Sequence, residues 1–542
     1  MDFNFDNKGK AIYQLENLSF GNSFSGNKHT LSGRYATKNW MIWSNSSVMK
    51  SDSELANSSF ARSQNRSSYK FEKNWVGATI NLEDNAEKLK TTNTFSALSQ
   101  RFIEYGAFIG RGDSTKVYVE LGFLQRQNDS LEFNTLERVN HSNSYYLKSQ
   151  LIKSGKRNLS VYLNYRTLKY EDNSKKDEPS LNSRILYSDQ FFDQLLQITT
   201  AYETSSGTIA QQEFTYLQVE PGQGVYMWND YNANGIQELQ EFEVAPYADL
   251  AIYIRIFLPN QVFIRTHQNK FSQSVNLNFN QWQNKTGLKQ FASHFYNQTS
   301  FLIDRKILRN ADNFNLNPFS NNEEELVGLN RSFRNSFFYN RGKQKHSTTY
   351  SYLLNESQNL LSVGSLSAKN KSHQLQYQHL VQKSWLFNFA GSSSVSESTS
   401  ENYPSRNFEI NSYRVEPKIG YLFSRNASWD LFYEFQQKEN QIGAFETLKQ
   451  TRLGTSFTFN SEKGFSMNGE FSLYNNNFNG DTLSAVAFQM LEGLQPGKNQ
   501  TWRLLLQKNL TQFLDVNINY QGRNSETSTT IHTGNVQLRA FF

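Results

Sequence analysis

The chain has 542 residues, of which 37% are apolar and 15% aromatic, and its formal net charge at pH 7 is +6. The 55 basic and 49 acidic side chains are spread along the sequence, so there is no basic block of the kind that binds nucleic acid. Cysteine is absent, which excludes disulfide bonds and thiolate metal sites.

The sequence has no candidate transmembrane helix, but its composition is typical of a membrane β-barrel. No apolar run reaches the ~18 residues that a membrane-spanning helix needs, and the longest, Leu250 to Leu258, is interrupted by Arg255. Barrel strands place apolar and aromatic side chains on lipid and polar side chains on water, which accounts for many aromatic residues at a low mean hydropathy. Soluble β-sandwiches also alternate, and they remain the alternative.

Apolar and polar residues alternate along most of the chain. Segments of ~10 residues with this alternation, separated by turn residues, are typical of barrel strands. Counting them predicts an all-β fold, an antiparallel transmembrane β-barrel of roughly 22 to 26 strands over residues 1–542. The clearest segments are Val117–Phe123, Leu159–Tyr165, Val275–Phe279, Trp385–Phe389, Trp429–Phe435 and Phe465–Leu473.

Two kinds of connection are expected between these strands. Short turns are predicted at Ser154-Gly155, Arg341-Gly342 and Glu462 to Gly464. In a barrel the tight turns face the periplasm and the long connections face outside. Long polar connections are predicted at Glu171–Asn182, Asn310–Glu325 and Ser394–Arg406, and Asp84–Leu98 has room for a short helix.

The most specific motif begins at Asp230 and satisfies the calcium-loop pattern D-x-N-x-N-G-x5-E. Calcium takes roughly six to eight oxygen ligands. Gly235 permits the sharp turn that such a loop needs. The predicted ligands are the side chains of Asp230, Asn232 and Asn234, the carbonyl of Ile236, Glu238 directly or through water, and Glu241.

The flanks of this motif depart from the helix–loop–helix arrangement of EF-hands. Val225 to Trp228 has the pattern of a strand, and Pro246 prevents a long exit helix. We therefore expect a calcium-loop-like connection over residues 225–247, set in β structure and with a structural role for Ca²⁺. A plain turn rich in Asn and Asp is the alternative.

No catalytic centre is evident. The eight histidines are scattered, and no Ser, His and Asp arrangement suggests itself, although triads form in space and not in sequence order.

Near His373, the alternation predicts that Gln374, Gln376 and Gln378 face the lumen. It also predicts that Leu375 and Tyr377 share the lipid side with His373.

The end of the chain alternates up to its last residue. Leu514 to Tyr520 and Gly534 to Phe542 are predicted strands, joined by a polar turn region over Gln521–Thr529. Val536, Leu538, Ala540 and Phe542 are expected to face lipid, while Asn535, Gln537 and Arg539 point inward. A bare apolar strand at a chain end invites aggregation, and closure of a barrel removes that edge. A terminal Phe preceded by alternating apolar residues resembles the signal recognised by the outer-membrane barrel assembly machinery.

Two stretches, Val225 to Glu243 and Ile531 to Phe542, resemble large outer-membrane β-barrel proteins of Bacteroidota, most of them unnamed. The resemblance covers about a tenth of the chain and implies a location in the outer membrane of a Gram-negative bacterium. It implies no catalytic residue. The first residues, Met1 to Asp6, do not form a signal peptide, so we expect the chain to be the C-terminal part of a longer precursor.

The sequence therefore predicts an outer-membrane barrel without catalysis, serving transport, secretion or surface scaffolding. Its expected partners are outer-membrane lipid and the barrel assembly machinery, and no nucleic acid. A β-sandwich binding protein with structural Ca²⁺ and an outer-membrane hydrolase are the two alternatives.

Overall fold

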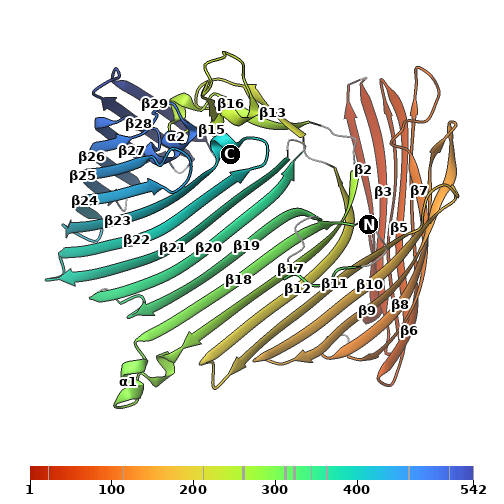
Figure 1. The fold of residues 1–542 in the computed structure, drawn as a ribbon. Helices are drawn as coiled ribbons and strands as arrows, with labels where there is room; N and C mark the ends of the chain where they lie inside the picture. Colours follow the sequence, from red (N-terminus) through yellow and green to blue (C-terminus); the bar gives the residue numbers. More distant parts are fainter. Residues whose placement is uncertain are drawn as a thin grey trace.

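One large antiparallel sheet of 25 strands dominates the computed structural model (Figure 1). The structure describes residues 1–21, 23–113, 115–210, 213–258, 263–309, 314–320, 325–343, 345–361, 364–461, 464–511 and 513–540. A separate sheet of 4 strands, β13 to β16, is inserted between β12 and β17. Apart from this insertion, each strand pairs with the next strand in the sequence. The sheet is thus a series of antiparallel hairpins, whose strands can be joined by short connections.

The strands of the large sheet are β1 (Asp2–Phe5), β2 (Gly9–Phe20), β3 (Phe24–Ala36), β4 (Trp40–Ser53), β5 (Ala56–Phe71), β6 (Asn74–Leu89), β7 (Gln100–Gly112), β8 (Tyr118–Glu132), β9 (Thr135–Lys153), β10 (Arg157–Tyr170), β11 (Glu178–Phe191), β12 (Leu196–Ala210), β17 (Phe263–Asn278), β18 (Phe295–Leu308), β19 (Leu326–Tyr339), β20 (His346–Leu361), β21 (Gly364–Val381), β22 (Trp385–Ser400), β23 (Phe408–Leu422), β24 (Ala427–Asn440), β25 (Thr447–Ser461), β26 (Phe465–Asn479), β27 (Gly497–Thr511), β28 (Leu514–Ser525) and β29 (Ile531–Ala540). The small sheet contains β13 (Glu213–Gln218), β14 (Tyr226–Trp228), β15 (Phe242–Val244) and β16 (Tyr253–Leu258). The helices are α1 (Leu288–Ala292) and α2 (Ala485–Leu491), with 3-10 turns at Asp6–Lys8, Leu239–Glu241, Ala248–Leu250, Phe279–Trp282 and Pro404–Arg406.

Alternation along each strand separates two faces of the large sheet. In β24, Leu431 and Tyr433 are 42% and 45% exposed, whereas the alternate residues Phe432 and Glu434 are 6% and 5% exposed. The side chains of successive strand residues point to opposite faces, so the exposed face is apolar. The predicted all-β antiparallel fold with about 22 to 26 strands is confirmed. The sandwich alternative is wrong, because a single sheet carries nearly all strands.

Charged side chains gather on the other face. Arg414, Glu434, Arg452 and Glu470 lie on four consecutive strands, β23 to β26. Arg414 and Arg452 lie 2.8 and 3.5 Å from Glu434 Oε2, and Arg452 also pairs with Glu470. This ladder runs across the strands of the concave face. The same strands carry rings and aliphatic groups on the convex face.

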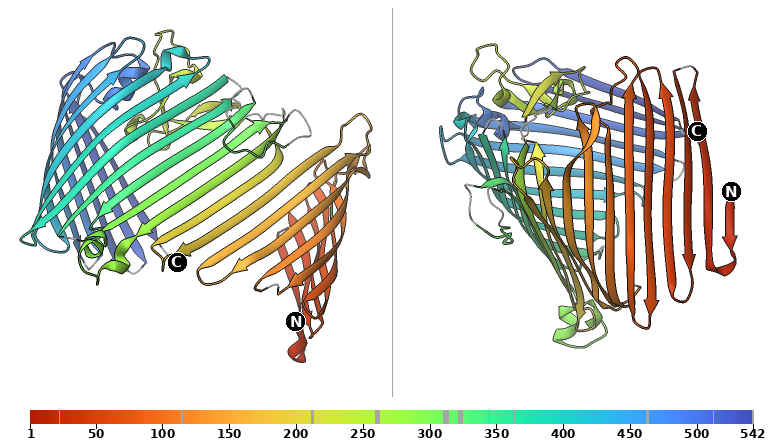
Figure 2. Two further views of the ribbon diagram at one scale, coloured as in Figure 1. Left: turned by 60° about the horizontal axis from the view of Figure 1, so that its bottom comes forward. Right: turned by 90° about the vertical axis from the view of Figure 1, so that its right-hand side faces the viewer.

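The two ends of the sheet differ in their connections (Figures 1 and 2). At the turn end, strands are joined by short connections such as residues 37–39, 154–156 and 382–384, with 279–294, which contains α1, as the long exception. At the loop end lie the long connections 90–99, 309–325 and 480–496 and the inserted small sheet. Rings pack in pairs at the turn end, including Trp40–Tyr69, Trp385–Tyr421 and Phe295–Phe337, with centroids 5.0, 4.9 and 5.3 Å apart.

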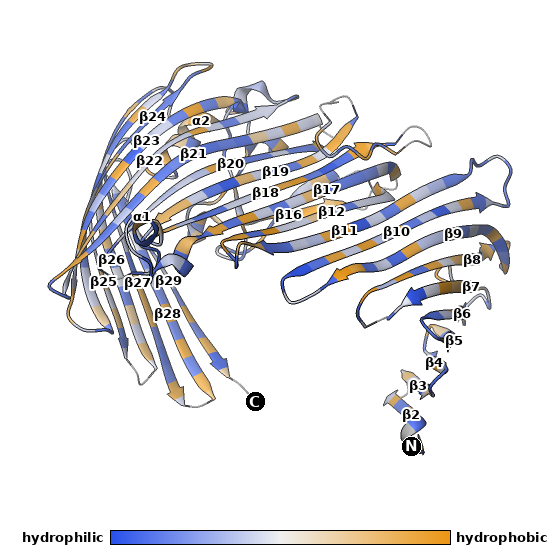
Figure 3. Ribbon diagram, turned by 90° about the horizontal axis from the view of Figure 1, so that it is seen from below, coloured by the Kyte–Doolittle hydropathy of each residue, from blue (hydrophilic) through white to orange (hydrophobic). Residues whose placement is uncertain are grey.

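The sheet curves round without its two edges meeting (Figure 3). Among the described residues, β29 pairs with β28 alone, and β2 pairs with β3 and, over Gly9–Ile12, with β1. The closed barrel expected from the sequence is therefore present as an open, curved sheet. Val536 and Leu538 of β29 pair with Ile518 and Val516 of β28, so that these four apolar side chains share one face. Phe541 and Phe542 lie outside the described residues.

Some local predictions were wrong because pairing with long neighbouring strands overrides local composition. Residues Asp84–Leu89 belong to β6 and form no helix, and Ser394–Ser400 completes β22. The predicted turn after Tyr520 starts late, since β28 continues to Ser525. The turns at Ser154 and Arg341 are confirmed, while Glu462 and Lys463 lie outside the described residues. Within the described ranges, no helix has both the length and the apolar content of a transmembrane helix.

Candidate functional site

The inserted segment, residues 213–258, is the most distinctive feature of the loop end. Its strands are ordered β13-β16-β14-β15 and hold a cluster of aromatic rings. Tyr216 stacks on Phe242 with centroids 4.0 Å apart, and Phe242 meets Tyr253 edge-on at 5.0 Å. Phe242 and Tyr253 are each 5% exposed, so the rings form a small core of their own.

Glu243 joins the inserted segment to two distant parts of the chain. Its Oε1 accepts hydrogen bonds from Arg406 at 2.7 Å and from the Tyr231 hydroxyl at 3.3 Å, and its Oε2 accepts from Gln489 at 3.3 Å. Arg406 lies between β22 and β23, and Gln489 lies on α2. Glu243 is 4% exposed, and this burial raises the pKa of its carboxyl group while Arg406 opposes the rise.

A second ion pair fastens the segment to the C-terminal part of the sheet. Arg523 of β28 donates to both carboxylate oxygens of Asp249, at 2.6 and 2.7 Å, and its guanidinium lies over the Tyr247 ring. The hydrogen bond from Arg523 holds the pKa of Asp249 below its ordinary value. Arg406 and Arg523 are far apart along the sheet, so a segment that reaches both lies on its concave side.

Helix α2 packs against the wall of the sheet and also contacts the inserted segment. Val486, Ala487 and Met490 are buried with Ile410 and Leu448 of the sheet wall. Lys438 donates to the carbonyl of Met490 at 2.9 Å, which satisfies one of the free carbonyls at the helix end. After the helix, Gly493 has a φ of +81°, and a Cβ there would lie 2.4 Å from Pro246 of the inserted segment. A glycine is needed at this contact.

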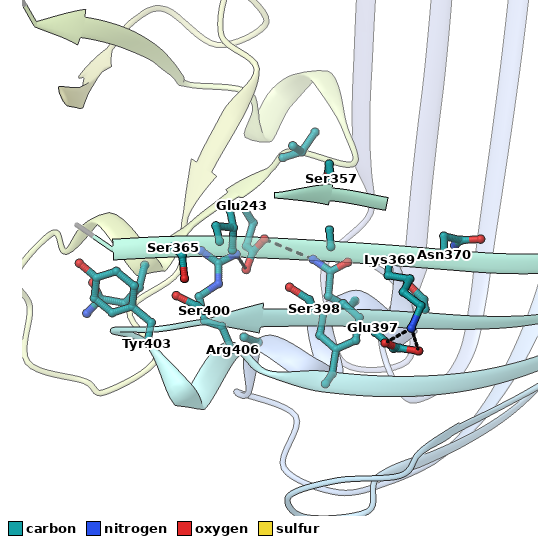
Figure 4. A pocket seen from close by; sticks show the side chains of 18 of the residues that line it. Glu243, Ser357, Ser365, Lys369, Asn370, Glu397, Ser398, Ser400, Tyr403 and Arg406 are labelled. Atoms are coloured by element: carbon teal, nitrogen blue, oxygen red, sulfur yellow. Dashed lines mark hydrogen bonds and ion pairs between the residues drawn. The ribbon is translucent and has the colours of Figure 1, made fainter. Parts of the chain in front are cut away.

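A pocket of about 630 Å³ lies between the inserted segment and the wall formed by β19 to β23 (Figure 4). Glu243 and Arg406 form one side of it, and the Lys369–Glu397 ion pair, 3.0 Å long, lies at the end away from Tyr403. Aromatic rings and small polar side chains line much of the rest, together with aliphatic side chains and Glu356; the rings and small polar groups include Phe214, Tyr216, Phe408, Ser357, Ser365, Ser398, Ser400 and Asn370.

Among the described residues that line this pocket, Arg255 is a cation without a carboxylate partner. Its guanidinium lies over the rings of Phe214, Tyr226 and Phe257, at 5.4, 5.7 and 5.4 Å from their centroids. Among the described residues, no carboxylate is within ion-pair distance of Arg255, whereas Lys369 and Arg406 are paired. In the part of the chain that the structure describes, the pocket therefore combines apolar rings, hydroxyl groups and the positive charge of Arg255.

Comparisons with solved structures find distant similarities. The siderophore receptor PirA from Acinetobacter baumannii is 8% identical, covers 95% of this chain and 76% of its own, and has a TM-score of 0.33. The FrpB iron transporter from Neisseria meningitidis is 10% identical, covers 90% of this chain and 77% of its own, with a TM-score of 0.32. The copper transporter OprC is 8% identical, with coverages of 95% and 73% and a TM-score of 0.31. No family model and no curated sequence matches the chain. At these identities and TM-scores, the similarity carries no argument about what this chain binds.

The predicted calcium loop lies in the inserted segment between β14 and β15. Asp230 accepts hydrogen bonds from the backbone N–H groups of Asn234 at 3.1 Å and Gly235 at 2.8 Å. The Oδ1 atoms of Asn232 and Asn234 accept from the backbone of Asn234 and Ile236 at 3.0 and 2.6 Å. Gly235 has a φ of +71°, as the predicted turn requires. Asp230, Asn232 and Asn234 are thus brought together around one turn.

The two glutamates among the predicted ligands are placed differently. Glu238 accepts from the side-chain amides of Asn232 at 2.6 Å and Gln240 at 2.8 Å, so it faces neutral groups. Glu241 is 1% exposed and accepts from Trp228 Nε1 at 2.7 Å and from the backbone N–H of Glu238 at 3.4 Å. Within the described ranges, no three His, Asp or Glu side chains are gathered so that they could hold a metal ion. The flanks agree with the prediction: a strand precedes the loop, and only a 3-10 turn follows it.

A serine–histidine pair lies on neighbouring strands of the sheet. Ser206 Oγ of β12 and His267 Nδ1 of β17 are 3.0 Å apart, and His267 is 1% exposed. The other ring nitrogen, Nε2, has no hydrogen-bond partner among the described residues. A serine nucleophile needs a base that is oriented by a third group, which this pair lacks in the described part of the chain. Sequence reasoning missed this pair, because its members are 61 residues apart.

Proposed function

We propose that the chain forms the wall of an outer-membrane barrel of a Gram-negative bacterium and that it serves transport without catalysis. The observation that carries this proposal is the contrast between the two faces of the same strands. An apolar convex face fits lipid, whereas the ladder of Arg414, Glu434, Arg452 and Glu470 would cost ~2–4 kcal/mol for each Arg placed on lipid near the midplane.

The differences between the two ends of the sheet support one orientation of the barrel in the outer membrane. Short connections, paired rings and the end of β29 lie together at the turn end, which fits the periplasmic side. The inserted segment and α2 then face outside, where a solute arrives. Outer-membrane lipid and, during biogenesis, the barrel assembly machinery are partners in this proposal.

In a bilayer the edges of β2 and β29 have to be paired, since hydrocarbon offers no hydrogen bonds to free backbone groups. β29 and β2 run in opposite directions, so they would pair as antiparallel strands. Pairing of each edge with further strands would also close the sheet. A barrel of this width has a lumen that its wall side chains cannot fill, which leaves room for a passage.

The inserted segment is proposed to act as a gate over this passage, with the pocket beneath it as the site where solute first binds. Arg255, held among three rings, would favour a solute with an anionic group next to an apolar one. The segment is attached chiefly by polar contacts at Glu243 and Asp249, so it can move without unfolding the wall.

The test is ion conductance in planar bilayers. Replacing residues 213–258 by a short Gly-Ser linker is expected to raise the single-channel conductance, because the gate is removed while the wall remains. A matched control replaces residues 279–294, a long connection at the turn end, and is expected to leave conductance unchanged. Equal conductance in the wild type and the gate variant would contradict the gate, and no conductance in either would contradict the transport role.

A further inference from the structure

We infer that the inserted segment holds one Ca²⁺ ion between residues 230 and 241. The ligands would be Asp230, Asn232, Asn234, the Ile236 carbonyl and Glu241, with Glu238 reached directly or through water. All the atoms that would bind the metal are oxygens, the ligand type that Ca²⁺ prefers. The inference rests on this loop alone and holds whether or not the barrel transports a solute.

Buried charge at Glu241 is the observation that points to a cation. The residue is 1% exposed, and the Oε1 atom of its carboxylate is buried without a hydrogen-bond partner among the residues that the structure describes. Its Oε2 accepts from two neutral donors, Trp228 Nε1 and the backbone N–H of Glu238. In the described part of the chain no Lys, Arg or His lies within ion-pair distance of it. A buried carboxylate is expected to be paired or to bind a metal.

The position of that carboxylate connects it to the loop. Its bond to the N–H of Glu238 places it against the ninth position of the calcium pattern, and the Glu241 carbonyl accepts from the N–H of Asn229, beside Asp230. The first and last ligands of the pattern therefore lie at the two ends of one closed loop. Since Glu238 is held by Asn232 and Gln240, it has to turn, or act through water, when a cation binds.

Magnesium fits this loop less well than calcium. Mg²⁺ demands tight octahedral geometry and gives up its water reluctantly, whereas Ca²⁺ accepts irregular shells that mix amide, carbonyl and carboxylate oxygens. The loop offers this mixture, with two Asn side chains and one carbonyl among its donors.

Calcium would also fix the shape of the neighbouring pocket. Leu239, Gln240 and Glu243 line the pocket and are close in sequence to Glu241. A cation that binds Asp230 and Glu241 would therefore hold this wall of the pocket in place. Without the cation, the three carboxylates of the loop repel one another, and the wall is expected to loosen.

Luminescence of Tb³⁺, an ion of similar size, is the probe, because Trp228 lies close enough to sensitise it through its contact with Glu241. The purified protein in detergent is expected to sensitise Tb³⁺ at one site, and Ca²⁺ but not Mg²⁺ should displace it. Asp230→Asn combined with Glu241→Gln is expected to weaken binding by about a hundredfold, since ligand charge sets affinity. Glu220→Gln removes one negative charge from the same segment, outside the loop, and should bind normally.

A gain-of-affinity variant keeps the test independent of folding defects. Asn234→Asp preserves the oxygen that accepts from Ile236 and adds a charged ligand, so Ca²⁺ binding should tighten by about tenfold. Heat-modifiable gel migration reports whether each variant is folded. Absence of Ca²⁺ binding by the folded wild type would overturn the inference, as would unchanged affinity in the double variant and in Asn234→Asp.

Discussion

Leu453→Arg is expected to destabilise the chain inserted in lipid vesicles. Leu453 is 48% exposed on the convex face in the middle of β25, opposite Tyr433 of β24. An Arg at the bilayer midplane costs about 2–4 kcal/mol on the lipid face, which lowers the equilibrium constant for folding into the membrane by about 30-fold or more. The measurement is a urea titration in vesicles, followed by the shift between folded and unfolded bands on a gel.

The matched control is Ser456→Arg on the same strand. Ser456 faces the concave side, where its hydroxyl lies 3.4 Å from Asp430 Oδ2, so a new Arg there would have water and a carboxylate. We expect normal insertion of this variant. Similar losses for both variants would show that the strand is intolerant of charge in general and would argue against a lipid-facing convex side.

Glu243→Ala is expected to release the inserted segment from the wall. The change leaves Arg406 and Tyr231 without their shared acceptor and removes the bond from Gln489. Truncating one partner of a buried charge pair costs about 2–5 kcal/mol, with the low end expected here because Arg406 is partly exposed. Hydrogen exchange at residues 213–258 should accelerate by roughly 30-fold or more, while the strands of the wall keep their protection.

Glu220→Ala is the control for this prediction, since Glu220 is an exposed residue of the same segment. The variant should exchange like the wild type. If Glu243→Ala left the exchange of the segment unchanged, Glu243 would not be what fastens it.

Attachment of the inserted segment should also depend on pH. Burial raises the pKa of Glu243 above 4.5, so the attached state binds its proton more tightly, and attachment weakens as pH rises through that raised pKa. Arg523 lowers the pKa of Asp249 below 3.8, so its contribution is present above 3.8 and lost as pH falls through the lowered value. Attachment of the segment is therefore strongest at a pH above 3.8 and below the raised pKa of Glu243. The variant Glu243→Gln should abolish the weakening that occurs as the pH rises through the raised pKa.

Local alternation was sufficient to predict most of the wall. Leu431 and Tyr433 were placed on one face by their spacing alone, and the structure confirms that face. The run of serines near Ser394 was predicted as a loop because small polar residues are common in loops, yet pairing with β21 and β23 makes it a strand. Composition is a weak guide where two long neighbours supply the hydrogen bonds.

The candidate site was predicted only where it is local. The loop from Asp230 to Glu241 is a sequence motif, and its turn at Gly235 is observed. The pair Glu243–Arg406 spans 163 residues and the pair Asp249–Arg523 spans 274, so no spacing rule could join their members. The pocket is made by these long-range contacts and could be found only in the folded chain.

Cysteine scanning of β21 tests the membrane barrel most directly, and the chain, which lacks cysteine, needs no background substitutions. Single cysteines at Gln374, Leu375, Gln376 and Tyr377 would each carry a spin label in lipid vesicles. We expect labels at 375 and 377 to collide with oxygen dissolved in lipid, and labels at 374 and 376 to collide with a water-soluble nickel complex. Equal access of the nickel complex to all four positions would contradict a barrel whose convex face lies in lipid.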